Sequence, residues 1–174
     1  IHEKKDTRKQ LKFGATYMTM NNPYFVNMDE NIEESVQAKG DILITRDPLQ
    51  DQKKQNEQIK DMINEGIDVL FLQPVDRNKV RPALELCKKK HIPVVVIDSE
   101  VSDTEAVVST IVSDNYDAGV QCAKDMMKKK TSANIIIVNQ KALNSINERV
   151  KGFRDTIKGH PQYKIVEEKE CRRV

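Results

Sequence analysis

Residues 68–98 have the sequence DVLFLQPVDRNKVRPALELCKKKHIPVVVID, in which two short apolar segments flank a helical pattern. The segments Asp68–Leu72 and Pro93–Asp98 are rich in Val, Leu and Ile, as is typical of buried strands. Between them, apolar residues recur at the i, i+3, i+4, i+7 spacing of one helix face, at Val80, Ala83, Leu84 and Cys87. A strand, a helix and a strand in this order form a βαβ unit, so the stretch predicts a parallel sheet.

The same alternation extends in both directions along the chain. Further strands are predicted at Leu11–Met18, Asp41–Thr45, Val107–Val112, Ala133–Asn139 and Tyr163–Glu167. Helices are predicted at about residues 23–38, 50–65, 77–90, 116–130 and 145–158. The fold class is therefore α/β, with open parallel sheets built from repeated βαβ units.

Local signals set some of the helix boundaries. Asn22 and Pro23 place a capping side chain directly before a proline at the first helical position. The sequence from Ser145 to Glu148 fits a capping box, which predicts a helix start at Ser145.

Composition excludes several classes of protein. The chain has 174 residues, with 29 Lys and Arg against 27 Asp and Glu, and a formal net charge of +2. This length allows one large domain or two small ones. A basic excess with clustered aromatic residues is absent, so nucleic acid is not an expected partner. The longest apolar runs, such as Pro93–Ile97, are far shorter than the roughly 20 residues that span a bilayer.

Motifs of common enzymes are also missing. The chain has only six glycines, and it contains neither the glycine-rich dinucleotide-binding fingerprint nor the phosphate-binding loop. His2, His91 and His160 lie far apart, without the spacing of zinc ligands, and no G-x-S-x-G motif occurs. We therefore expect no enzyme activity, no cofactor and no metal.

Polar residues follow the predicted strands at their carboxyl ends, where ligands bind in open α/β sheets. Helix capping accounts for some of them, including Asn22, but neither Gln73 nor Asp98 is needed to start a helix. Asp98 ends a nearly all-apolar strand, where a carboxylate without donors would be costly. Carboxylates and amides suit a ligand with several hydroxyls, and Tyr24 and Phe25 offer apolar ring faces, although at least one of these is expected to face inward. The pattern predicts a sugar site.

Five segments together resemble a known family, the type I periplasmic solute-binding proteins of bacterial sugar ABC transporters, and especially its ribose-binding branch. They are Phe13–Phe25, Leu72–Asp76, Ile92–Asp98, Val112–Asn115 and Asn147–Phe153. The resemblance implies two α/β lobes that close on a monosaccharide and pass it to an ABC permease. It also implies an extracytoplasmic location, in the periplasm or lipid-anchored at the outer face of the cell membrane.

The resemblance further implies a role for each matching side chain. Asn22 would bind a hydroxyl, Tyr24 and Phe25 would contact the ring, and Asp98 would be the main carboxylate acceptor. Gln73 would form a polar wall, Ser113 a contact beside the hinge, and Arg149 a donor from the second lobe. Ribose binders usually have Asn at the position of Gln73 and Arg at that of Ser99, so the identity of the sugar stays open.

The resemblance divides the chain into three parts. Residues 1–10 are expected to be a polar linker, residues 11–112 the first lobe, and residues 113–174 the start of a truncated second lobe. Such an amino-terminal portion would bind sugar weakly, and its uncovered sheet edge predicts self-association.

Alternative functions share the same architecture. An effector-binding domain of a lac-repressor-family regulator has the two-lobe fold, and a sensor module would carry the same sugar site. A flavodoxin-like enzyme is the alternative from a different class, since fold alone does not establish function.

Overall fold

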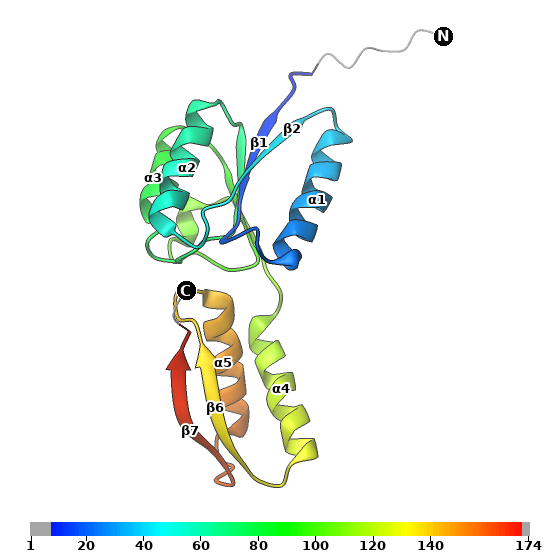
Figure 1. Cartoon of the computed structure of the whole chain (residues 1–174), viewed down its shortest axis with the longest axis vertical. Helices are drawn as coiled ribbons and strands as arrows, with labels where there is room; N and C mark the ends of the chain where they lie inside the picture. Colours follow the sequence, from blue (N-terminus) through cyan, green and yellow to red (C-terminus); the bar gives the residue numbers. More distant parts are fainter. Residues whose placement is uncertain (1–7, 172–174) are drawn as a thin grey trace, which may run out of the picture.

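The computed structural model describes residues 8–171 and forms two bodies, each built on a parallel sheet (Figure 1). We call the body of β1–β5 and α1–α3 the first lobe, and the body of α4, α5, β6 and β7 the second lobe. The strands of the first lobe are β1 (Lys12–Thr16), β2 (Ile42–Arg46), β3 (Val69–Leu72), β4 (Val94–Ile97) and β5 (Ser109–Ile111). Its helices are α1 (Pro23–Gln37), α2 (Gln52–Asn64) and α3 (Arg81–Lys89), and a 3-10 turn, η1 (Thr104–Ala106), precedes β5.

The first lobe is a five-stranded parallel sheet in the order β2-β1-β3-β4-β5. Helix α1 covers one face of this sheet, and α2 and α3 cover the other (Figure 1). Alternate residues of β3 divide between the two faces: Leu70 and Leu72 join the core beneath α2 and α3, whereas Phe71 packs on the side of α1. Both faces are covered, as the continuous apolar runs in these strands predict.

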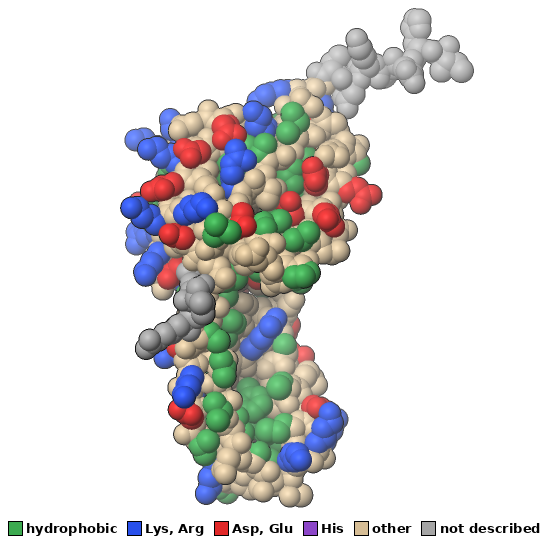
Figure 2. Space-filling model, viewed as in Figure 1, with side chains coloured by type: hydrophobic (Ala, Val, Ile, Leu, Met, Phe, Trp, Pro, Cys, Tyr) green, Lys and Arg blue, Asp and Glu red, His purple; other side chains and the backbone are tan. Residues whose placement is uncertain are grey.

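The second lobe contains α4 (Asn115–Lys129), β6 (Ala133–Asn139), α5 (Asn144–Ile157) and β7 (Tyr163–Glu170). Strands β6 and β7 pair in parallel, and α4 and α5 pack side by side (Figure 1). A small core forms around Ala123, Ile157 and Tyr163. Hydrophobic side chains are also visible on the surface of this lobe (Figure 2), where Ile136 and Val138 of β6 are 58% and 63% exposed.

All the predicted strands and helices are present, with ends shifted by a few residues. The capping box at Ser145 was wrong. Helix α5 begins one residue earlier, at Asn144, and its N-cap Leu143 makes no side-chain capping bond. Ser145 instead lies inside the first turn, and its backbone N–H donates to the Ser99 hydroxyl of the first lobe (3.2 Å). A contact between lobes thus replaces the local cap that the sequence pattern favours.

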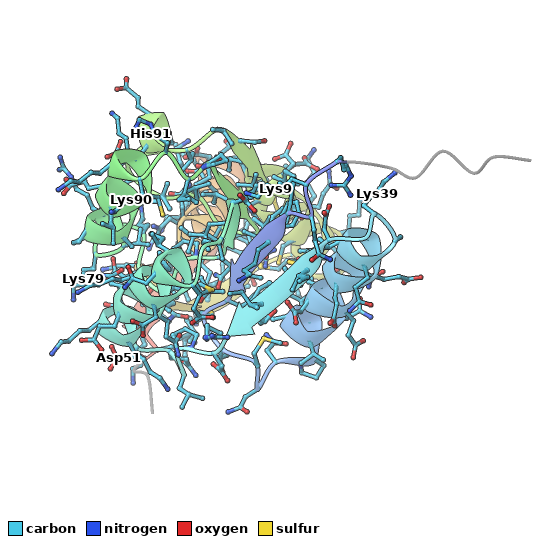
Figure 3. All side chains as sticks on the ribbon, turned by 90° about the horizontal axis from the view of Figure 1, so that it is seen from above. Lys9, Lys39, Asp51, Lys79, Lys90 and His91 are labelled. Atoms are coloured by element: carbon cyan, nitrogen blue, oxygen red, sulfur yellow. The ribbon has the colours of Figure 1, made fainter. Side chains whose placement is uncertain are left out.

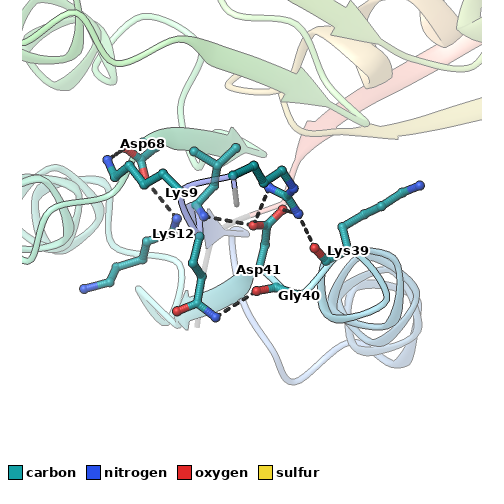
Figure 4. Close-up of polar contacts among 9 residues, drawn as sticks. Lys9, Lys12, Lys39, Gly40, Asp41 and Asp68 are labelled. Carbon is teal, nitrogen blue, oxygen red and sulfur yellow. Dashed lines mark hydrogen bonds and ion pairs between the residues drawn. The ribbon is translucent and has the colours of Figure 1, made fainter. Parts of the chain in front are cut away.

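Two carboxylates hold the amino end of the first sheet (Figure 4). The backbone N–H of Leu11 donates to Asp41 (2.8 Å) and that of Lys12 donates to Asp68 (2.9 Å). Arg8 forms an ion pair with Asp41, and Lys9 forms one with Asp68. Figure 3 looks down on this end and shows Lys9 beside β1 and Lys39 at the end of α1.

The expected linker thus falls in two parts. Residues 1–7 lie outside the described residues, and residues 8–10 are exposed but bonded to the first lobe. Within residues 8–171, no helix combines the length and the apolar character that crossing a membrane requires.

The lobes are joined between β5 and α4 by residues 112–114. The carboxyl ends of the first sheet point toward the second lobe (Figure 1). The fold therefore gathers the polar strand ends at the junction between the lobes.

Candidate functional site

A cavity of about 330 Å³ lies at the carboxyl ends of β4 and β5, beside the start of α1. Most of its lining is apolar, and its polar groups come from Tyr24, Asp98 and Ser113. The lining residues are Tyr24, Met28, Ile32, Ile97, Asp98, Ile111, Val112 and Ser113. An apolar wall with a few convergent polar groups is typical of a small-molecule site.

Asp98 occupies a special backbone position at the end of β4. Its φ of +66° lies in the left-handed region, which Asp tolerates better than most residues. Its backbone N–H donates to the carbonyl of Ile111 (2.9 Å), which fixes the turn against β5. Burial raises the pKa of the Asp98 carboxyl, while a hydrogen bond from Tyr24 and the charge of Arg149 lower it. Burial is the largest of these effects, so the ionised carboxylate lacks part of the solvation it would have in water.

Tyr24 and Phe25 follow the cap of α1 and point in different directions. Asn22 accepts a hydrogen bond from the backbone N–H of Tyr24 (3.0 Å), so its side-chain oxygen caps the helix as expected. Tyr24 is 53% exposed and lines the cavity, whereas Phe25 is 4% exposed and belongs to the core with Ala15 and Ile97. The ring of Phe25 meets that of Tyr24 edge to face, with centroids 5.4 Å apart. Phe25 therefore supports Tyr24 and lies outside the residues that line the cavity.

Gln73 directly follows β3 and is fully buried, and it is not among the residues that line the cavity. Its side-chain oxygen accepts from the backbone N–H of Met18 (2.6 Å), which fixes the segment between β1 and α1. Its amide nitrogen has no hydrogen-bond partner among the described residues, which is unusual for a buried donor.

Arg149 lies on α5 in the second lobe, and its orientation depends on Asn115. The Arg149 Nε–H donates to the Asn115 side-chain oxygen (2.9 Å), and the Asn115 amide donates to the carbonyl of Ser113 (3.1 Å). Asn115 is buried, and its one amide group links the Arg149 side chain to the backbone of Ser113. Asn115 lies in the segment Val112–Asn115 that carries the resemblance, but sequence reasoning gave it no role of its own at the site. The cap of α4 is Asp114, which accepts from the backbone N–H of Asp117 (2.9 Å).

A second cavity, of about 180 Å³, lies beside the first and is lined by both lobes. It shares Val112 and Ser113 with the first cavity. Glu100 of the first lobe faces Asn144 and Ser145 of the second lobe here. Sequence reasoning missed these residues, because each contact joins positions more than 40 residues apart.

A groove of about 720 Å³ runs along α1, is lined largely by apolar residues such as Phe13 and Phe71, and shares Tyr24, Met28 and Ile32 with the first cavity. Among residues 8–171, His, Cys, Asp and Glu side chains form no group of three that could hold a metal ion. Of the expected polar site residues, Asp98 lines the first cavity, whereas Arg149 lines neither cavity at the junction and borders a cavity of about 290 Å³ within the second lobe.

Comparisons of the chain with family models and with known proteins indicate the same family. The family model described as "Periplasmic binding protein domain" matches residues 13–173. The chain is 31% identical over 116 residues to the ribose import binding protein of Bacillus subtilis (strain 168), covering 67% of this chain and 38% of that protein. It is 29% identical over 145 residues to the ribose import binding protein of Haemophilus influenzae, covering 82% of this chain and 49% of that protein.

Solved structures show the same architecture. An ABC transporter solute binding protein from Mycobacterium smegmatis, with bound glycerol, superposes with a TM-score of 0.85 at 30% identity, covering 91% of this chain and 56% of that one. The myo-inositol binding protein of Caulobacter superposes with a TM-score of 0.84 over 92% of this chain and 55% of that one, at 22% identity, which shows likeness of fold alone. The chain spans about half the length, or less, of the curated relatives named above.

Proposed function

Because the chain belongs to the periplasmic binding protein family, we propose that it forms part of an extracytoplasmic receptor that captures a simple sugar between two lobes. The receptor passes the sugar to the permease of an ABC transporter. It acts in the periplasm or, with a lipid anchor, at the outer face of the cell membrane. The lobes of this proposal are residues 11–112 and residues 113–174.

The observation that carries the proposal is the position of Asp98. A half-buried carboxylate with a raised pKa stands at the edge of a mostly apolar cavity, next to the exposed ring of Tyr24. A carboxylate accepts hydrogen bonds from two neighbouring hydroxyls, and an aromatic ring packs against the C–H face of a sugar. Because burial removes part of the hydration of the Asp98 carboxylate, hydrogen bonds from sugar hydroxyls would replace the lost water contacts.

The remaining site residues have supporting roles in the proposal. Asn22 uses its side-chain oxygen as a cap, which leaves its amide group to donate to a sugar hydroxyl. Gln73 has a buried amide donor without a hydrogen-bond partner among the described residues, and Ser113 lines the cavity at the junction. Phe25 holds Tyr24 in place from the core.

Closure of the lobes gives the mechanism. Asp98 belongs to the first lobe and Arg149 to the second, and the charge of Arg149 lowers the pKa of Asp98 across the junction. A sugar that bonds to both favours the closed arrangement by its differential affinity for it. The permease would recognise this closed shape.

The sugar is proposed to be ribose or a similar monosaccharide. Ribose import binding proteins are among the relatives, and the solved neighbour from Mycobacterium smegmatis has bound glycerol, which supports a sugar or small polyol as the ligand. These relatives are transport proteins, so the repressor effector domain is not favoured. Since the chain spans about half their length, we propose that it binds sugar weakly by itself.

Nuclear magnetic resonance titration of the chain with pentoses and hexoses tests the proposal, because the method detects binding as weak as roughly millimolar. We expect sugar-dependent shifts at Asp98, Tyr24 and Ser113, and loss of these shifts in Asp98→Asn. Asp47→Asn is the matched control, because Asp47 follows β2 at the same edge of the sheet but lies outside both cavities. Shifts that persist in Asp98→Asn, or that no sugar produces, would contradict the proposal.

A further inference from the structure

Asn144, the first residue of α5, connects three elements across the lobe junction. Its side-chain oxygen accepts a hydrogen bond from the Arg77 guanidinium, and its amide donates to the Glu100 carboxylate (2.7 Å). Arg77 follows β3 and Glu100 follows β4, so one side chain of the second lobe holds two separate loops of the first. Asn144 is 8% exposed, and a buried amide of this kind is stable only when its groups are bonded.

Further bonds reinforce this contact. The backbone N–H of Arg77 donates to the carbonyl of Ala142 (3.0 Å), and the backbone N–H of Ser145 donates to the fully buried hydroxyl of Ser99 (3.2 Å). The guanidinium of Arg77 is fixed in turn, because its Nε–H donates to the Ser102 hydroxyl (2.8 Å). We call Arg77, Ser99, Glu100, Asn144 and Ser145 the interlobe cluster.

The interlobe cluster sets the position of the helix that carries Arg149. Asn144 and Arg149 lie on the same helix, about 7.5 Å apart along its axis at 1.5 Å per residue. The start of α5 is held against the first lobe by Asn144, and the guanidinium of Arg149 is turned by Asn115. These two contacts together fix where Arg149 lies relative to the first lobe.

We propose that Asn144 is a positioning residue for sugar capture, which holds the start of α5 against the first lobe and so stabilises the closed arrangement without contacting the sugar. The inference rests on the function proposed above. Because the bonds of Asn144 to Arg77 and Glu100 exist only when the lobes meet, they raise the closed fraction before sugar binds. Apparent affinity scales with the fraction of molecules in the binding-competent state, so the interlobe cluster tunes affinity from outside the site.

The separation of the lobes in solution provides the first test. Spin labels are placed on the exposed Cys122 of α4 and on a cysteine introduced at the exposed Lys89 of α3, in a Cys171→Ser background. We expect Asn144→Ala to lengthen and broaden the distance distribution between the labels by several ångströms. Asn147→Ala is the matched control, because Asn147 lies in the same helical turn and its side chain donates to the carbonyl of Lys141 in its own lobe. An unchanged distribution in Asn144→Ala would overturn the proposal.

A second variant keeps the test valid if Asn144→Ala impairs folding, which circular dichroism will show. Arg77→Ala removes the side chain that donates to Asn144, so it should lengthen the distance between the labels in the same way. The double variant with Asn144→Ala should lengthen that distance little more than either single variant does. Full additivity of the two changes would also contradict a shared contact.

Sugar titration separates this proposal from the proposed function. Asn144→Ala should weaken binding by about five-fold or more, as in typical couplings between distant sites, with the pattern of preferred sugars unchanged. If no sugar binds but the label distances change as expected, the proposed function fails and the interlobe cluster stands. If sugar binds equally well to Asn144→Ala with unchanged distances, Asn144 has no positioning role.

Discussion

Gly119 of α4 and Gly152 of α5 each lie against the backbone of the other helix. A Cβ atom at Gly119 would stand 2.0 Å from the carbonyl oxygen of Arg149, and one at Gly152 would stand 2.0 Å from that of Tyr116. Neither position has room for a side chain, so the two helices approach more closely than residues with side chains would permit. This approach brings Asn115 at the start of α4 within hydrogen-bonding distance of Arg149 on α5.

Gly119→Ala should therefore destabilise the second lobe and displace Arg149. The added methyl group meets rigid backbone, so α4 and α5 must separate, at a cost of about 1–3 kcal/mol in the free energy of unfolding. Chemical denaturation measures the change. Gln121→Ala, at an exposed position on the same helix, should stay within about 0.5 kcal/mol of the parent. Equal stability of the two variants would show that the helices adapt.

Asp98→Asn should change stability and sugar binding in opposite directions. Removing a half-buried charge favours the folded state, so the midpoint of thermal unfolding should rise slightly. Loss of a charged hydrogen-bond acceptor should cost about 1.5–3 kcal/mol of binding free energy, or about ten-fold to more than a hundred-fold in affinity. Thermal denaturation and titration together check this, and a variant that loses both stability and binding would indicate a structural role for Asp98.

Sugar affinity should fall on acidification at a pH above the ordinary pKa of aspartate. Burial raises the pKa of Asp98, so its carboxylate protonates before an exposed one does and then loses acceptor capacity. Protonation of Asp98 has the opposite effect on stability. Because the fold favours the neutral carboxyl, the contribution of Asp98 to the free energy of unfolding is present at low pH and is lost as pH rises through the raised pKa. Affinity measured against pH should show the decline in the parent, with a flat profile for Asp98→Asn.

Acid should loosen the opposite end of the first sheet. The hydrogen bond from Arg8 lowers the pKa of Asp41, and that from Lys9 lowers the pKa of Asp68. Their contribution to stability is present above the ordinary aspartate pKa and is lost as pH falls through the lowered values. The backbone N–H groups of Leu11 and Lys12 donate to these carboxylates, so their protection against hydrogen exchange should fall as pH falls through the lowered pKa values. Exchange in Asp41→Asn should already be faster at Leu11 at neutral pH.

Much of the fold could be predicted because its signals are local. The apolar runs of β3 and β4 and the helical spacing from Val80 to Cys87 each act within a few residues, and the structure contains the βαβ unit they predict. The orientation of Tyr24 and Phe25 could not be assigned, because both are aromatic neighbours at a helix start and only the packing against Ala15 and Ile97 buries Phe25.

The interlobe contacts were beyond prediction for a different reason. Asn144 bonds to Arg77, 67 residues away, and no spacing in the sequence connects the two. The same contacts explain why the capping pattern at Ser145 was misleading, since its backbone N–H bonds to Ser99. Glycines inside the predicted helices at residues 119 and 152 were a usable signal of close packing.

Because residues 112–114 connect the lobes, a rotation at this connection moves the far end of α4 much more than its start. The helix starts at Asn115 and has 15 residues, so its far end lies about 22 Å from the connection. A rotation of about 10° there would displace that end by about 4 Å while Asn115 itself hardly moves. A small change in how the lobes meet around Asp98 would thus be amplified at the outer tip of the second lobe, near Lys128 and Lys129.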